Sequence, residues 1–287
     1  MATSDLLPIY RNAREWIMEA GENLRQSIKT NIRVMYKTSI KNLVTDKDRE
    51  IEQFFIERIR QKYPGHQILA EEGVYKEEIK NPYKEWVWII DPIDGTTNFV
   101  HQKCNFCVSV ALYYQGKPQL GLVYDPVVDE LFYAIKGHGA YLNDQPLDKL
   151  EQRPIEEAVI GINSLWLTPN RYFDYRPLQA LVGAVRGSRS LGSAALELSY
   201  VASGRLDAYF ALSLSPWDFG AGVFIAQEAG ALASTITNQP IPIFEKTSIF
   251  IARPGLHQSI VDQFLSTSPA FQNHATANQQ NGHYKRD

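Results

Sequence analysis

Acidic residues lie beside glycine turns in several short segments of the chain. The most compact segment is DPIDGTT at residues 91–97, in which two acids lie three positions apart across a proline. The proline bends the chain, so both carboxylates and the carbonyl of Ile93 can point to one side, and such hard oxygen ligands suit Mg²⁺ or Mn²⁺. Gly95 lets the backbone approach a ligand, and the amides of Gly95 and Thr96 would offer a local anion site. The motif therefore predicts a cation next to a phosphate group.

Three further segments carry acids of the same kind: TDKD at residues 45–48, EEG at residues 71–73 and WDFGAG at residues 217–222. Taken singly, each acid is explained more simply as a solvated turn residue or a helix cap. Taken together, they suit phosphate ester hydrolysis, which enzymes accelerate by up to about 10²¹-fold. One general acid or base supplies only about 10²- to 10⁴-fold. Metal ions that activate water and neutralise the leaving oxygen can supply a larger share of this acceleration, so a carboxylate cluster fits the reaction.

Hydrophobic patterns predict the elements that must position these acids. In the first half we expect helices over residues 6–24 and after Thr45 or Asp46, strands over 67–70 and 86–90 that lead directly into carboxylates, and an antiparallel meander over 107–142. In the second half we expect strands over 158–162, 183–186, 206–212, 231–236 and 249–252, alternating with helices near 177–181, 193–202, 218–229 and 256–265. The expected class is α+β for the N-terminal half and α/β for the C-terminal half.

The turn-rich stretch at residues 143–154 is the expected domain boundary. An α+β domain over 1–145 would then carry most of the acids, an α/β domain over 146–267 would supply Asp218 and substrate contacts, and residues 268–287 would form a disordered tail.

Composition excludes several functional classes. The 287 residues include 32 acids against 29 Lys and Arg, a formal net charge of −3 that argues against a polycationic nucleic-acid binder. Two cysteines exclude a disulfide-dense secreted scaffold. No apolar run approaches the roughly 20 residues that a membrane helix needs. We therefore expect a cytoplasmic protein with a small-molecule substrate and neither nucleic-acid nor membrane partners. Divalent metal would mask the acids that gather at the site, so that a phosphate could approach.

The order and length of the motifs resemble those of the inositol monophosphatase family, Mg²⁺-dependent and Li⁺-sensitive phosphatases. The resemblance rests on WIIDPIDGTTNF at residues 88–99, with AEEG at 70–73 before it and WDFGAG at 217–222 after it, and it extends from about residue 6 to residue 265. It implies a layered αβαβα sugar-phosphatase fold and a homodimer. It also implies hydrolysis of inositol monophosphate, or a related small phosphate ester, by metal-activated water without a phosphorylated enzyme.

The resemblance further implies a role for individual residues. Metal ligands would be Glu71, Asp91, Asp94, Asp218 and the carbonyl of Ile93, and catalytic residues would be Thr96, Asp48 and Glu71. Phosphate or substrate contacts would come from Gly95, Thr96, Thr97, Gly192, Ser193, Ala194 and Lys37. Two to three Mg²⁺ per subunit are implied, with Mn²⁺ as an alternative. Four ligand carboxylates, three Mg²⁺ and a phosphate dianion sum to zero charge, whereas without metal the acids would repel one another.

Ala211 departs from the family pattern, which places a hydroxyl-binding glutamate at this position. A methyl group there should relax or redirect specificity. Arg186 and Arg189 either point into solvent or contact a second phosphate group of the substrate. The second possibility makes NADP(H) phosphatase or fructose bisphosphatase activity an alternative. A non-enzymatic role in transcription or ribosome assembly, known for some bacterial relatives, is another. Cys104 and Cys107 form a single C-x-x-C without a second pair, so a zinc or redox role is disfavoured.

Overall fold

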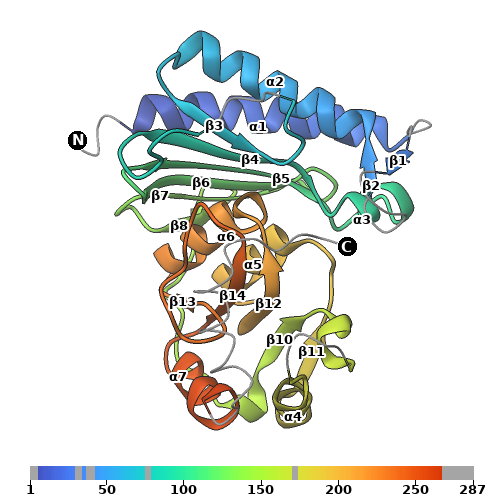
Figure 1. Ribbon diagram of the computed structural model, residues 1–287, viewed down its shortest axis with the longest axis vertical. Coiled ribbons are helices and arrows are strands. Elements are labelled where there is room, and N and C mark those ends of the chain that lie inside the picture. Colours follow the sequence, from blue (N-terminus) through green and yellow to red (C-terminus); the bar gives the residue numbers. More distant parts are fainter. Residues whose placement is uncertain (1–5, 30–33, 37–42, 75–78, 170–173, 267–287) are drawn as a thin grey trace.

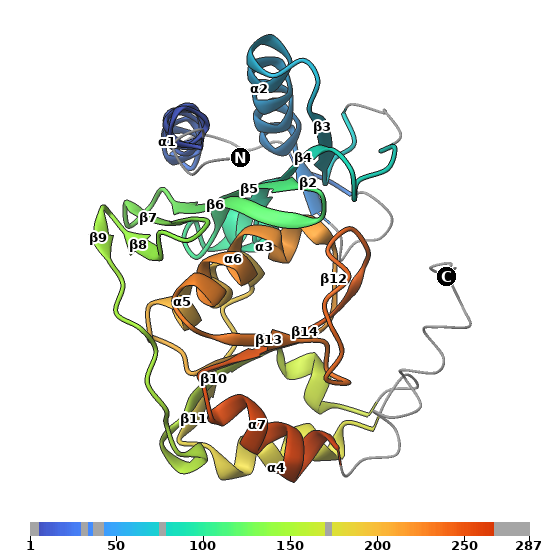
Figure 2. The ribbon, with the colours of Figure 1, turned by 90° about the vertical axis from the view of Figure 1, so that its left-hand side faces the viewer.

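The chain folds into five layers in which two sheets alternate with three layers of helices (Figures 1 and 2). The structure is a computed structural model that describes residues 6–29, 34–36, 43–74, 79–169 and 174–266. Helices α1 (Leu7–Ser27) and α2 (Asp46–Lys62) cover one face of the larger sheet, α5 (Ala194–Ala202) and α6 (Pro216–Glu228) lie between the sheets, and α4 (Arg176–Ala184) and α7 (Leu256–Ile260) cover the far face of the smaller sheet. The expected αβαβα arrangement is confirmed.

The larger sheet has seven strands in the order β3-β4-β5-β6-β7-β8-β9. These strands are Gln67–Ala70, Trp86–Asp94, Cys107–Tyr114, Lys117–Asp125, Glu130–Ile135, Ala140–Leu142 and Gln145–Pro146. Only the β3–β4 pair is parallel among them, so the predicted antiparallel meander is confirmed, and β9 extends it by one strand. Alternation along β4 sends Ile89 toward α5 and α6 and Ile90 toward α1 and α2, which is why this strand is apolar throughout.

The smaller sheet has five strands in the order β11-β10-β12-β14-β13. In chain order they are β10 (Val159–Ile162), β11 (Gly187–Arg189), β12 (Ala208–Leu214), β13 (Leu232–Ser234) and β14 (Thr247–Ala252). The strand expected at residues 183–186 is wrong, because α4 continues to Ala184 and the strand begins at Gly187. Leu178 and Leu181 are both buried on one face of α4, and this packing favours the helix over the extended form that the nearby valines suggest.

Smaller elements complete the described chain. They are the two-stranded sheet of β1 (Val34–Tyr36) and β2 (Leu43–Thr45), the short helix α3 (Thr96–His101), 3₁₀ turns at Ile155–Glu157 and Ser164–Leu167, and a π-helical turn at Val261–Leu265. None of the helices in the described ranges is long and apolar enough to cross a membrane.

Side chains from both sheets contribute to the core around α5 and α6, so the two halves of the chain pack against each other. The division at residues 145 and 146 into two domains stays a prediction. The tail expected to be disordered, residues 268–287, lies outside the described residues.

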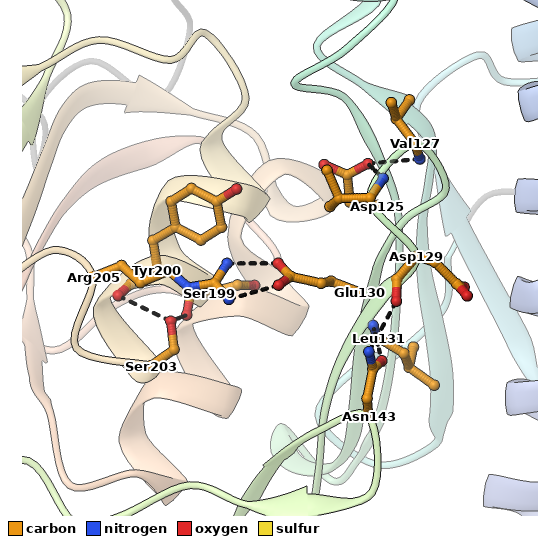
Figure 3. Close-up of polar contacts among 11 residues, drawn as sticks. Asp125, Val127, Asp129, Glu130, Leu131, Asn143, Ser199, Tyr200, Ser203 and Arg205 are labelled. Carbon is orange, nitrogen blue, oxygen red and sulfur yellow. Dashed lines mark hydrogen bonds and ion pairs between the residues drawn. The ribbon is translucent and has the colours of Figure 1, made fainter.

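An ion pair ties the C-terminal end of α5 to the larger sheet (Figure 3). Arg205, just after α5, donates to both oxygens of Glu130 on β7, at 2.5 and 2.6 Å. Its guanidinium also lies over the rings of Phe132 and Tyr200, 5.6 and 5.1 Å from their centroids. We call the pair of Arg205 and Glu130 the clasp, since it joins a residue of the second half to a strand of the first.

Candidate active site between the two sheets

Asp91 and Asp94 lie at the end of β4, where its pairing with β5 is interrupted. Asp91 pairs with Ser109 and Asp94 with Cys107, so β4 advances three residues while β5 advances two. Pro92 accounts for the interruption, since proline has no N–H to donate to a neighbouring strand. Residues three apart in a regular strand face opposite sides, and the extra residue allows both carboxylates to reach the same side. Both acids are buried, with exposed fractions of 1% and 7%.

Asp218 joins these two acids from the start of α6. One carboxylate oxygen from each of Asp91, Asp94 and Asp218 lies within 4.8 Å of the other two. A capping box places Asp218, because its Oδ2 accepts a hydrogen bond from the backbone N–H of Ser215 at 2.7 Å.

Asp48 is placed in the same way at the start of α2. Its Oδ2 accepts hydrogen bonds from the backbone N–H and the hydroxyl of Thr45, at 2.7 and 2.5 Å, so Thr45 and not Asp46 caps the helix. This leaves Oδ1 toward Thr96, whose hydroxyl lies 3.3 Å from it and 3.1 Å from the carbonyl of Ile93. Three of the predicted site residues, from two distant parts of the chain, are therefore in contact.

The start of α5 holds Asp94 from the other side. The Ser193 hydroxyl and the Ala195 backbone N–H both donate to Asp94 Oδ2, each at 2.6 Å. Ser193 is also the N-cap of α5 and accepts from the N–H of Leu196. The positive end of the helix dipole therefore faces the carboxylate, which stabilises its charge.

The turns that follow these acids are packed tightly together. Gly95 has a φ of 91°, and a Cβ on it would lie 3.1 Å from the carbonyl oxygen of Asn105 and 3.3 Å from Ser193. Asn98 in α3 donates from its Nδ2 to the carbonyls of Asn105 and Leu191, both at 2.7 Å. Gly95 is thus needed for its backbone conformation and for close approach, and Asn98, whose role the sequence did not reveal, ties the turns of the two halves together.

Glu71 lies half-buried after β3 and forms a hydrogen bond with Asp91. It lies near enough to raise the pKa of Asp91, Asp94 and Asp218 by charge repulsion. The segment after it is held by Glu52, a fully buried acid of α2 that accepts from the N–H groups of Glu72 and Val74 at 2.6 and 2.7 Å. Sequence reasoning missed Glu52. The signal that could have found it was an acid four residues after Asp48, on the same helix face, beside buried Ile51 and Phe55.

The buried, mutually repelling carboxylates of the cluster favour the binding of cations. Burial, reinforced by the neighbouring acids, raises the pKa of Asp91 well above its usual range and that of Asp218 to about 8. Burial also raises the pKa of Asp94 to about 6, although hydrogen bonds from Ser193 and Ala195 oppose the rise. Several buried acids with hard oxygen atoms converge here, which is the donor set that Mg²⁺, Mn²⁺ or Ca²⁺ prefers. The residues present therefore fit such an ion.

A cavity of about 270 Å³ opens beside the cluster. Its lining comprises Asp94, Asn163, Trp166, Gly192, Ser193, Ala194, Glu197, Tyr209, Ala211, Ser213, Leu214 and Asp218. Ala211, where a hydroxyl-binding acid was expected, is part of this wall. Glu197, which the sequence did not single out, lines it as well, and its burial raises the pKa of its carboxyl to about 7.

Two further predicted contact residues are Thr97 and Lys37. Thr97 is exposed, and Lys37 lies outside the described residues. Arg186 and Arg189 are exposed and do not line the cavity, which agrees with their interpretation as solvated residues. Cys107 is a buried free thiol, with Sγ 3.6 Å from the Ser193 hydroxyl and 3.9 Å from Asp94.

This layered fold, with an acidic cluster at the junction of its two sheets, is that of a phosphoric monoester hydrolase. A family model for the inositol monophosphatase family matches residues 5–268, and the chain belongs to that family. It is 45% identical over 253 residues to an inositol-1-monophosphatase of Bacillus subtilis, a match that covers 88% of this chain and 95% of the relative. It is also 37% identical over 237 residues to a Pseudomonas aeruginosa protein named Nus factor SuhB, covering 80% and 86% of the two chains.

Solved structures show the same relationship. A Staphylococcus aureus inositol monophosphatase, SaIMPase-II, bound to inositol monophosphate, superposes with a TM-score of 0.84 at 37% identity, over 96% of this chain and 99% of the other. An IMPase/NADP phosphatase complexed with Mg²⁺ and phosphate superposes with a TM-score of 0.83 at 26% identity, over 93% and 98% of the two chains.

Proposed function

We propose that the chain is a Mg²⁺-dependent phosphomonoesterase that hydrolyses inositol monophosphate or a related small phosphate ester. The observation that carries this proposal is the convergence of Asp91, Asp94 and Asp218 within 4.8 Å, beside Gly95, Thr96 and Asp48. Glu71 and the carbonyl of Ile93 complete the proposed ligand set. Two to three Mg²⁺ bound there, or Mn²⁺ in their place, would lower the pKa of the attacking water and stabilise charge on the leaving oxygen.

The chain's own residues have distinct tasks in this mechanism. The Thr96 hydroxyl and Asp48 Oδ1 lie side by side, so they can orient a water molecule and accept its proton. The backbone amides of Gly95 and Thr96 would hold the phosphate oxygens, as preorganised donors do for developing negative charge. The Gly192, Ser193 and Ala194 turn faces the cavity that would hold the alcohol part of the ester.

The decisive experiment is a phosphate-release panel with Mg²⁺, with and without Li⁺, on the wild type and on Asp94→Asn. We expect hydrolysis of at least one small phosphate ester by the wild type, inhibition by Li⁺, and near-complete loss of turnover in the variant. Inertness of the wild type toward every ester, or wild-type kcat in the variant, would refute the proposal.

NADP(H) and a sugar bisphosphate belong in the same panel, because Ala211 leaves one cavity wall without an acid. If every ester is inert, binding of a transcription or ribosome-assembly partner becomes the favoured alternative, in view of the relative named Nus factor SuhB. We also propose a cytoplasmic homodimer. Light scattering after size-exclusion chromatography would test the dimer, and cell fractionation would test the location.

A further inference from the structure

Glu197 is a buried acid that faces the substrate side of the cavity without belonging to the metal cluster. It lies in the first turn of α5, and only 4% of the residue is exposed. Asp94 and Asp218, the other acids that line the cavity, converge with Asp91 and are assigned to cations. Glu197 is therefore the acid available to the alcohol part of a bound ester, among the residues that line this cavity.

The carboxyl of Glu197 is held in place by the substrate-facing turn. It accepts a hydrogen bond from the backbone N–H of Leu191, at 3.2 Å, and the neighbouring backbone of Gly192 helps to lower the pKa of the carboxyl. The carbonyl of Leu191 is in turn fixed by Asn98 at 2.7 Å. A carboxylate has about four acceptor positions, so the bond from Leu191 leaves capacity for further hydrogen bonds.

The walls around Glu197 restrict what such a further partner could be. Gly161 lies behind it, where an added Cβ would be 3.1 Å from Oε1, and Tyr209 and Ala211 border the cavity beside it. A buried carboxyl gains most from a hydroxyl donor that arrives with the ligand, and a site built in this way rejects analogues that lack the hydroxyl.

We propose that Glu197 determines substrate specificity by forming a hydrogen bond with a hydroxyl group on the alcohol part of the ester, which selects phosphate esters of polyols. This inference rests on the proposed function, since it takes the phosphate to lie at the acidic cluster. It assigns recognition of hydroxyl groups to α5 and leaves β12, with Ala211, as a wall without an acid.

The test compares two esters that share a six-membered ring, inositol 1-phosphate and cyclohexyl phosphate, which lacks the hydroxyls. Glu197→Gln keeps an acceptor for the Leu191 amide while removing the charge. We expect it to lower kcat/KM for inositol 1-phosphate about 10-fold or more and to leave kcat/KM for cyclohexyl phosphate within about twofold. Inhibition by inorganic phosphate should stay unchanged, because the proposal places phosphate at the acidic cluster and gives Glu197 contact only with the alcohol part of the ester.

The matched control is Glu228→Gln, since the Glu228 carboxyl also accepts from backbone amides, those of Gly137 and Gly139, but does not line the cavity. This variant should leave kcat/KM for both esters unchanged. Equal losses on both esters in Glu197→Gln, or no loss on either, would overturn the proposal. If Glu197→Gln fails to fold, the wild type still tests the proposal. Equal kcat/KM of the wild type for inositol 1-phosphate and cyclohexyl phosphate would also overturn it. A wild type inactive toward every ester would instead refute the proposed function.

Discussion

Replacing Asp218 by asparagine should stabilise the metal-free protein while weakening its response to Mg²⁺. Burial and the neighbouring acids raise the pKa of Asp218 to about 8, against 3.8 for an ordinary aspartate. Between these two values the native state without metal holds a proton that the unfolded chain has released. The free energy of unfolding therefore falls as pH rises through this interval, and the contribution present below pH 3.8 is lost by about pH 8.

The magnitude follows from the same interval. At about 1.36 kcal/mol per pH unit, the span from pH 3.8 to pH 7 corresponds to a ceiling of about 4 kcal/mol. Asp218→Asn has no proton to take up, and its amide oxygen can still accept from the Ser215 N–H, so the cap of α6 survives. The variant without metal should exceed the wild type at pH 7 by about 1–4 kcal/mol, with a weaker dependence on pH.

Urea unfolding in EDTA from about pH 5 to pH 8 measures this difference. A second series with Mg²⁺ should stabilise the wild type, since an ion that binds only the native state raises its stability, and should stabilise the variant far less. Asp262→Asn, an exposed acid on the last helical turn, is the control and should follow the wild type in both series. A variant with the wild-type pH dependence, or with an undiminished Mg²⁺ response, would refute the reasoning.

Three further changes test other parts of the structure. Thr96→Ala removes the hydroxyl beside Asp48, so kcat should fall about 10²-fold or more while stabilisation by Mg²⁺ persists, and a loss of that stabilisation would contradict the assignment. Gly95→Ala places a Cβ at a φ of 91° and 3.1 Å from a carbonyl oxygen, so the free energy of unfolding in urea should fall by about 1–3 kcal/mol. Wild-type stability of this variant would contradict the prediction. Arg205→Ala should cost only about 1 kcal/mol, because the clasp is partly exposed, and a double-mutant cycle with Glu130→Ala should give a coupling energy above zero.

The local part of the site was predictable because adjacent residues build it. Pro92 and Gly95 determine how the chain bends at the end of β4, so the directions of Asp91 and Asp94 follow from the motif itself. Asp48 and Asp218 each follow a Thr or Ser by three residues, which is the signature of a capped helix start.

The supporting acids could not be placed in this way. Glu52 and Glu197 lie in otherwise apolar helix faces. The donors to Glu52 come from a segment about 20 residues further along the chain, which only the tertiary fold brings near. The donor to Glu197 is the backbone N–H of Leu191, in the turn before its own helix, and no sequence motif marks this contact. Asn98 likewise acts through a carbonyl from the other half of the chain. The misplaced strand before Gly187 has the same origin, because Leu178 and Leu181 favour a helix only once they can pack into the core on the far face of the smaller sheet. An element that is fixed by distant packing gives a weak local signal.

The capping boxes of Asp48 and Asp218 also bear on how this fold can evolve. Each side chain fixes the start of its own helix with Oδ2, and each carboxylate is part of the proposed site. Asparagine would preserve the cap and, on the proposed roles, abolish the contribution to catalysis, and one nucleotide converts an aspartate codon into an asparagine codon. A lineage can therefore lose catalysis in a single step without losing a folded protein, and its surface stays free to acquire binding partners.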